Sequence, residues 1–186
     1  MILPIYTFGT KVLREKSKKV VKVDDKIMLL IKNMFETMKA SQGIGIAANQ
    51  VGVAKKIFLV DISEMEEYKH ITPMVFLNPE IIFETGSWEM EEGCLSIPNI
   101  RANVLRSEKI KIKFQDINLE YNEIEANEFL ARVILHEFDH INGVLYIDKV
   151  SNEIKRNIKS ELKKIEKGDF KCSYKTFTKK EEVKKK

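Results

Sequence analysis

Residues 127–143 read NEFLARVILHEFDHING, and this stretch decides the fold. Asn127 can cap a helix that covers residues 128–142, and Gly143 can end that helix in a left-handed conformation. The first turns of the helix are apolar nearly all round, which predicts that the helix is buried. Buried imidazole and carboxylate groups need partners, so we expect the polar residues of this helix to form a site.

The pattern His-Glu-X-X-His at residues 136–140 is typical of a metal site on a helix. His136 and His140 are four positions apart, so their side chains lie about 5–6 Å from each other at Cβ and can hold one ion. Glu137 can reach a water on that ion without being a ligand itself. The alternative is a chance pattern on an ordinary amphipathic helix. The chain has only three histidines, and the third, His70, is expected to be an ordinary surface residue.

A catalytic metal usually has three protein ligands and one position for water. The candidate for the third ligand is Cys94, in the stretch EEGCLSIP at residues 91–98. Gly93 lets the backbone approach the helix closely there. A lone cysteine is also a common small buried hydrophobe, so spacing alone leaves both interpretations open. Cys172, among lysines near the C-terminus, is given no role.

The composition is that of a globular protein with one domain. The chain has 186 residues, of which 44% are hydrophobic and 32% are charged. Two cysteines do not make a disulfide scaffold, which favours a reducing compartment. We find neither a signal peptide nor an apolar stretch long enough to cross a bilayer, so the expected location is cytoplasmic, with no membrane partner.

Hydrophobic periodicity predicts the remaining elements. Asp24 can cap a helix that runs to about Ala40 and ends at Gly43, and a last amphipathic helix starts at Ser151. Strands are expected at residues 56–62, 74–85, 109–114 and 119–124, with a turn at 116–118. The fold class is therefore α+β, with strands and a β-hairpin around a central metal-binding helix, and a C-terminal helix.

Charge divides the chain into two parts. Residues 151–186 contain 13 Lys+Arg and 6 Asp+Glu and so carry +7, whereas residues 1–150 carry −3. We expect 1–150 to be the catalytic part, and 151–186 to be a basic helix and tail of the same domain. From Gly168 onward the sequence is polar and rich in lysine, which predicts a frayed end.

The glycine-rich stretch GIGIAANQVG at residues 43–52 does not fit a phosphate-binding loop. It lacks the lysine of a P-loop, and it follows a helix where a dinucleotide-binding loop would follow a strand. We expect small residues packed against a site, where the side-chain amide of Gln50 can meet a substrate.

Three segments taken together, residues 43–50, 92–96 and 136–140, resemble in order and spacing the three motifs of the peptide deformylases. The resemblance extends from the N-terminus to about Asp148, and it makes Cys94 a metal ligand. It implies an α+β fold and hydrolysis of the N-formyl group from the formyl-methionine of new polypeptides, with release of formate. It also implies one divalent metal, usually Fe(II), with Zn(II) or another divalent ion able to replace it.

The resemblance also implies a role for individual residues. The metal ligands are Cys94, His136 and His140; Glu137 transfers the proton; the Gln50 side chain and the Leu95 backbone N–H stabilise the oxyanion. Substrate-contacting positions are Ile44, Gly45, Glu92, Arg101, Phe129 and Val133, of which Ile44, Phe129 and Val133 match the methionine pocket. Two residues depart from the pattern: Gln42, where an acid is common, and Arg132, where an apolar wall is expected. The Arg132 guanidinium is expected to reach solvent or an acid.

Two other functions fit parts of the sequence. A zincin-type metallopeptidase uses the same helix motif, but it usually takes a third ligand from downstream, and no histidine follows His140. A nucleic-acid-binding protein would depend on the basic tail and would be sensitive to salt. For a deformylase, that segment is a candidate for contact with ribosomal RNA.

Overall fold

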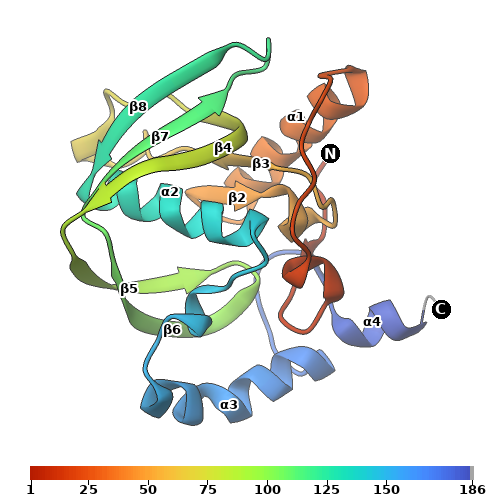
Figure 1. Ribbon diagram of the computed structural model, residues 1–186. Coiled ribbons are helices and arrows are strands. Elements are labelled where there is room, and N and C mark those ends of the chain that lie inside the picture. The colour runs from red at the N-terminus through yellow and green to blue at the C-terminus, as the bar shows by residue number, and fades with distance from the viewer. Residues whose placement is uncertain (185–186) are drawn as a thin grey trace.

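The computed structural model describes residues 1–184, and its central element is the helix α2 (Glu128–Ile141). Figure 1 shows α2 between a five-stranded sheet and a two-stranded hairpin. The α+β class and the C-terminal helix expected from the sequence are confirmed. Among the described residues, no helix combines the length and the apolar character needed to cross a membrane.

The five-stranded sheet is antiparallel throughout, in the order β2-β3-β4-β7-β8. Its strands are β2 (Gly45–Ala47), β3 (Ile57–Val60), β4 (Met74–Thr85), β7 (Lys109–Gln115) and β8 (Tyr121–Asn127). Four short 3-10 helices complete the body: η1 (Lys11–Arg14), η2 (Ala48–Val51), η3 (Glu66–Tyr68) and η4 (Tyr146–Asp148). In the core, the rings of Phe58 and Phe76 stack with centroids 4.6 Å apart. Ile134 of α2 belongs to the same cluster, so the sheet and α2 share one core.

The helix α1 (Asp25–Ala40) begins where the sequence predicts, because the Asp24 carboxylate accepts a hydrogen bond from the N–H of Ile27 at 3.0 Å. It also ends at Ala40, as the sequence predicts, and the residue with a positive φ that follows it is Gln42, at 55°, rather than Gly43. The N–H of Gly43 then bonds to the carbonyl of Met38 at 2.9 Å, which directs the chain into β2.

A hairpin that the sequence analysis missed, β5 (Trp88–Cys94) and β6 (Ile97–Arg106), brings Cys94 to α2. Buried and exposed residues alternate along β6, with Ile100, Ala102 and Val104 facing inward. That period of two is the signal that could have identified the strand.

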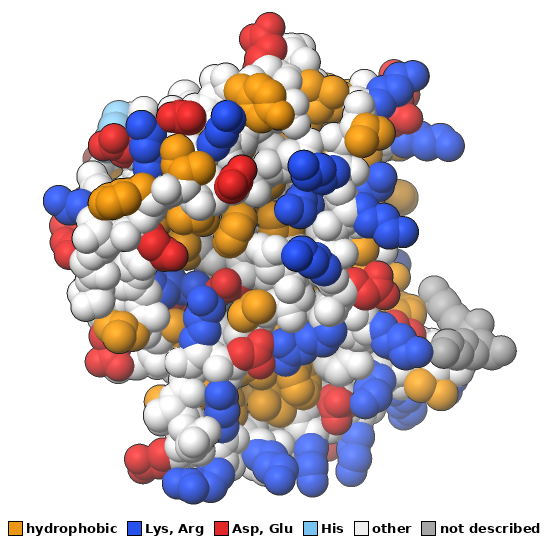
Figure 2. Space-filling model, in the orientation of Figure 1, with side chains coloured by type: hydrophobic (Ala, Val, Ile, Leu, Met, Phe, Trp, Pro, Cys, Tyr) orange, Lys and Arg blue, Asp and Glu red, His pale blue; other side chains and the backbone are white. Residues whose placement is uncertain are grey.

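The helix α3 (Asn152–Lys167) packs the apolar stripe of Ile154, Ile158, Leu162 and Ile165 beneath the hairpin, and Ser151 caps it. Figure 2 shows Lys and Arg side chains along the lower edge of the molecule, where α3 runs.

The prediction of a frayed end after Gly168 is wrong. The strand β9 (Thr176–Phe177) pairs in parallel with β1 (Ile5–Tyr6), and the short helix α4 (Lys179–Lys184) follows. The Phe177 ring lies 4.5 Å from the Tyr6 ring, centroid to centroid, and Phe177 is buried. Contacts with the distant N-terminus therefore order this segment, and the local sequence does not reveal them.

Candidate active site

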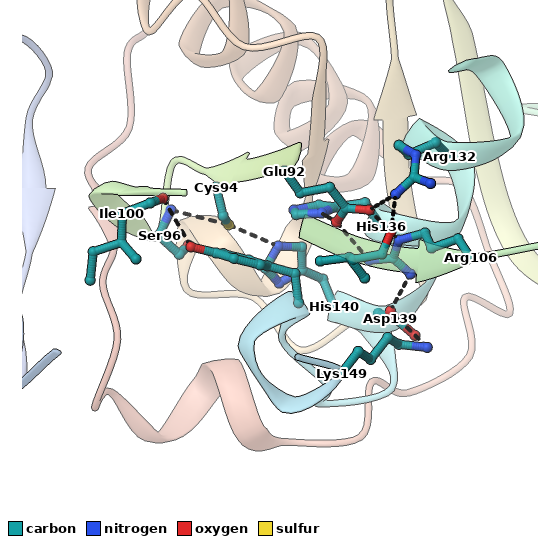
Figure 3. Close-up of polar contacts among 12 residues, drawn as sticks. Glu92, Cys94, Ser96, Ile100, Arg106, Arg132, His136, Asp139, His140 and Lys149 are labelled. Atoms are coloured by element: carbon teal, nitrogen blue, oxygen red, sulfur yellow. Dashed lines mark hydrogen bonds and ion pairs between the residues drawn. The ribbon is translucent and has the colours of Figure 1, made fainter. Parts of the chain in front are cut away.

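Three potential metal ligands meet between the hairpin and α2. Cys94 comes from the end of β5, and His136 and His140 come from successive turns of α2. Their ligand atoms all lie within 4.8 Å of one another, and Sγ of Cys94 is 3.2 Å from Nε2 of His140. Figure 3 shows the Cys94 side chain directed toward His140. The structure thus brings together the three residues that the sequence indicated as ligands.

The chemistry of these residues fits a divalent metal. Burial lowers the pKa of His140 well below its usual value, which keeps the imidazole in the neutral, metal-binding form. Burial also lowers the pKa of His136, but hydrogen bonds with Cys94 and Glu92 outweigh it and raise that pKa. Nδ1 of His136 lies 2.9 Å from the Glu92 carboxylate, which leaves Nε2 for an ion. One thiolate and two imidazoles suit both Zn(II) and Fe(II).

The carboxyl group of Glu137 is buried beside the metal ligands. Burial raises the pKa of Glu137 to about 7, and its Oε2 has no hydrogen-bond partner among the described residues. A Cβ atom on Gly45 would lie 2.6 Å from Oε1 of Glu137, so only glycine lets β2 approach this closely. A carboxylate with a pKa near neutral and a free oxygen is suited to take a proton and return it.

Gln50, in η2, has a fixed orientation. Its Oε1 accepts a hydrogen bond from the N–H of Ala47 at 2.8 Å. Its Nε2 is therefore directed toward the metal ligands, 3.5 Å from Sγ of Cys94 and 3.3 Å from Oγ of Ser96. The side-chain amide offers its N–H groups to the space beside the thiolate.

Glu92 is the centre of a buried ionic network, which Figure 3 shows. Its carboxylate accepts hydrogen bonds from Arg106 at 2.5 and 2.9 Å and from Arg132 at 2.7 Å, in addition to its contact with His136. Burial raises the pKa of Glu92, but the hydrogen bonds from His136 and Arg106 outweigh it and hold the pKa far below its usual value. Both carboxylate oxygens are engaged within the protein. Glu92 contacts His136 in this way and also lines the cavity described below, so the substrate contact expected from the sequence stays a prediction.

Arg132 is 4% exposed and belongs to this network. Besides Glu92, its guanidinium donates to the carbonyls of Val104, at 2.9 Å, and Trp88. Of the two outcomes expected for Arg132, the structure shows contact with an acid and not with solvent.

A cavity of about 660 Å³ opens in front of the metal ligands. Residues from the three motifs line it, together with others from α2 and β6. All positions predicted to contact the substrate line it, namely Ile44, Gly45, Glu92, Arg101, Phe129 and Val133, and so do Gln42 and Leu95. Arg101 is largely exposed and lies 3.5 Å from the carboxylate of Glu91.

The same cavity has a wall that the sequence analysis missed. It is formed by Cys172, Ser173 and Tyr174. The hydroxyl of Tyr174 donates a 2.8 Å hydrogen bond to the carbonyl of Leu95. Three aromatic residues in this lysine-rich segment, Phe170, Tyr174 and Phe177, were the sequence signal that it packs against the body.

The comparisons with known proteins agree with this geometry. The family profile described as Polypeptide deformylase matches residues 2–156. The chain belongs to this family. A peptide deformylase from Chlorobium phaeobacteroides is 42% identical over 174 residues, which are 94% of each chain.

Solved deformylases have the same fold. The structure from Legionella pneumophila has a TM-score of 0.82 at 34% identity and covers 90% of this chain and 96% of its own. The structure from Synechococcus elongatus in complex with actinonin has a TM-score of 0.79 at 36% identity and covers 86% and 87%. The predicted family is confirmed: the chain is a metal-dependent hydrolase that acts on N-formyl groups of new polypeptides.

Proposed function

We propose that this deformylase works with Cys94, His136 and His140 as metal ligands and with Glu137 as the group that transfers the proton. The observation that carries the proposal is the buried Glu137 carboxyl, with its free Oε2 and a pKa of about 7, next to these three ligands. A divalent ion, when bound, polarises an oxygen and makes water more acidic.

The protein's own groups account for the proton transfers. Glu137 takes a proton from the attacking water while the oxygen of that water bonds to the formyl carbon. The carbon–nitrogen bond then breaks, and Glu137 delivers the proton to the leaving amine nitrogen. The products are formate and a polypeptide with a free amino terminus.

Two donors are assigned to the negative charge that develops on the formyl oxygen. Nε2 of Gln50 is directed toward Cys94, and Leu95 follows Cys94 at the tip of the hairpin. We assign the side-chain amide of Gln50 and the backbone N–H of Leu95 to the oxyanion. Donors aimed at a developing charge usually contribute about 10²–10³-fold to the rate.

The cavity supplies the specificity. Ile44, Phe129 and Val133 are among its apolar lining residues and are assigned to the methionine side chain. Gly45 and Arg101 are assigned to the substrate backbone, Gly45 beside Glu137 and Arg101 at the mouth.

The metal that we propose is Fe(II), with Zn(II) as the alternative. A thiolate beside a redox-active iron is sensitive to oxidation. Protein purified without air should therefore contain iron and lose activity on exposure to air. Activity unchanged after long exposure would point instead to zinc or to another divalent ion that air does not oxidise.

We also propose that α3 contacts ribosomal RNA. Arg156, Lys159 and Lys163 are exposed, whereas Lys155 donates to the carbonyl of Asp148 and Lys164 pairs with Glu161.

The catalytic residues assigned above fall in residues 1–150, and this helix in 151–186. Because the substrate is a new polypeptide, the expected compartment is the cytoplasm.

Charge reversal tests the ribosome contact. Replacing Lys159 and Lys163 with Glu should leave turnover of a short formyl-Met peptide unchanged and reduce cosedimentation with ribosomes at low salt. A matched replacement of Lys111 and Lys113 on β7 is the control for net charge. Equal cosedimentation of both variants with the original protein would leave α3 as a solvated surface. Truncation after Gly168 is unsuitable, because it removes a wall of the cavity.

Formate release from a formyl-Met peptide tests the function itself. A zincin-type metallopeptidase would cleave internal peptide bonds and release no formate. The described ligand group has no member downstream of His140, which favours deformylation.

A further inference from the structure

The segment of residues 169–178, called the C-terminal strap here, is fixed on both sides of Tyr174. On one side, Nδ2 of Asn99 donates to the carbonyl of Lys171 at 2.9 Å. On the other, the N–H of Ile5 donates to the carbonyl of Lys175 at 2.9 Å, where β9 joins β1. Tyr174 is thus held against the cavity by β6 and by the N-terminal strand.

Tyr174 reaches the tip of the hairpin that carries the metal ligand. Its hydroxyl donates to the carbonyl of Leu95 at 2.8 Å, and its side chain is half-buried. Leu95 lies between Cys94 and Ser96, outside both strands. The N–H of the same peptide, that of Ser96, donates to Sγ of Cys94 at 3.4 Å.

The other described contacts of this tip involve Ser96 and the Leu95 side chain, whereas the Leu95 carbonyl is bound by the strap. The carbonyl of Ser96 accepts from the N–H of Phe8 at 2.8 Å, and Oγ of Ser96 accepts from Gln50 at 3.3 Å. The Leu95 side chain packs beside Gly43, where an added Cβ would lie 2.8 Å from Cδ1 of Leu95. The hydroxyl of Tyr174 and Sγ of Cys94 therefore hold the carbonyl and the N–H of one peptide, Leu95–Ser96. This limits the backbone rotation ψ at Leu95, the residue at which that peptide joins the Cys94–Leu95 peptide that carries the Leu95 N–H.

We propose that Tyr174 is a positioning residue of the active site, which holds Leu95 so that its backbone N–H faces the formyl oxygen. This inference rests on the role proposed above for Leu95. It also gives the strap, which is not part of the three motifs, a function in catalysis.

The variant Tyr174→Phe tests this inference because it removes one oxygen and keeps the ring. We expect kcat per bound metal to fall about fivefold on a formyl-Met tripeptide, with KM unchanged, since the donor acts on charge present only in the transition state. Metal content and melting temperature should stay at the original values. The control is Tyr121→Phe on β8, where the tyrosine is 70% exposed and does not line the cavity.

An unchanged kcat in Tyr174→Phe would overturn the proposal, and so would a fall in kcat that merely follows loss of metal or of melting temperature. A second measurement does not depend on activity. In protein labelled with nitrogen-15 leucine, Tyr174→Phe should shift the amide resonance of Leu95, and Tyr121→Phe should not. A Leu95 resonance unmoved by Tyr174→Phe would refute the positioning role, whatever the activity of the original protein. Absence of formate release from the original protein would instead refute the proposed function.

Discussion

Helix α2 and the C-terminal strap line the same cavity, but they reach it in different ways. The side chains of α2 are placed by helical spacing, which puts His136 and His140 on one face whatever surrounds them. Tyr174 is placed by pairing of β9 with β1 and by the contact of Asn99 with Lys171. The two histidines are thus placed locally, whereas the strap depends on the rest of the fold. Substitutions near α2 should therefore affect chemistry most strongly, and substitutions in the strap should modulate it.

The largest contrast is expected between the two cysteines that line the cavity. Cys94→Ala should lose the metal and nearly all formate release, since two protein ligands remain. Cys172→Ala, in the strap, should keep one metal per chain and most of the turnover. Metal analysis by mass spectrometry checks both. Tight stoichiometric metal in Cys94→Ala would mean that another group is the third ligand.

Glu137→Gln should give the next largest effect. The amide cannot take up the proton, so turnover should fall by about 10²–10⁴-fold while the metal stays bound. Steady-state formate release and metal content in the same preparation measure this. Turnover near that of the original protein would exclude Glu137 as the proton-transferring group.

Gly45→Ala should displace the carboxylate of Glu137 by steric contact. The added methyl group would meet Oε1 of Glu137 at 2.6 Å, whereas at Gly93 it would meet Arg101 at an ordinary 3.5 Å. Displacement of the carboxylate by about 1 Å can reduce turnover by about 10²-fold. Gly93→Ala is the matched control and should have a much smaller effect on kcat. Equal kcat values for the two variants would show that the approach of β2 to Glu137 is unimportant.

Glu92→Gln should have the smallest effect on chemistry and the clearest effect on metal binding. The substitution removes the negative charge that orients Nδ1 of His136. The same charge neutralises Arg106 and Arg132 in the original protein. Contacts of this kind usually change metal affinity by about 10–100-fold. Competition with a chelator measures this, and Glu123→Gln on the exposed strand β8 is the control. An unchanged affinity in Glu92→Gln would limit the network to stabilising the fold.

The sequence predicted α1, α2, α3 and most strands of the sheet because their periodicity is local. The grouping of Cys94, His136 and His140 was predicted as well, since each lies in a short motif with fixed spacing. The ion pairs of Glu92 were not, because its partners Arg106 and Arg132 come from β6 and α2, and no local pattern shows that they converge on one carboxylate.

The strap was mispredicted for a similar reason. Its strand β9 has two residues, too few for a pattern of alternation, and the lysines around it are typical of a solvated end. The segment is ordered by hydrogen bonds to residues more than 70 positions away, such as that of Asn99 with Lys171. Long-range contacts of this kind become visible only in the folded structure.

The most direct test of the central claim is an assay on protein purified without air, with metal and formate measured on the same sample. The account predicts about one divalent metal per chain, formate release from a formyl-Met peptide, and loss of that release when a chelator removes the metal, with recovery on adding Fe(II). Formate release that persists in metal-free protein, or cleavage of internal peptide bonds without formate, would contradict it.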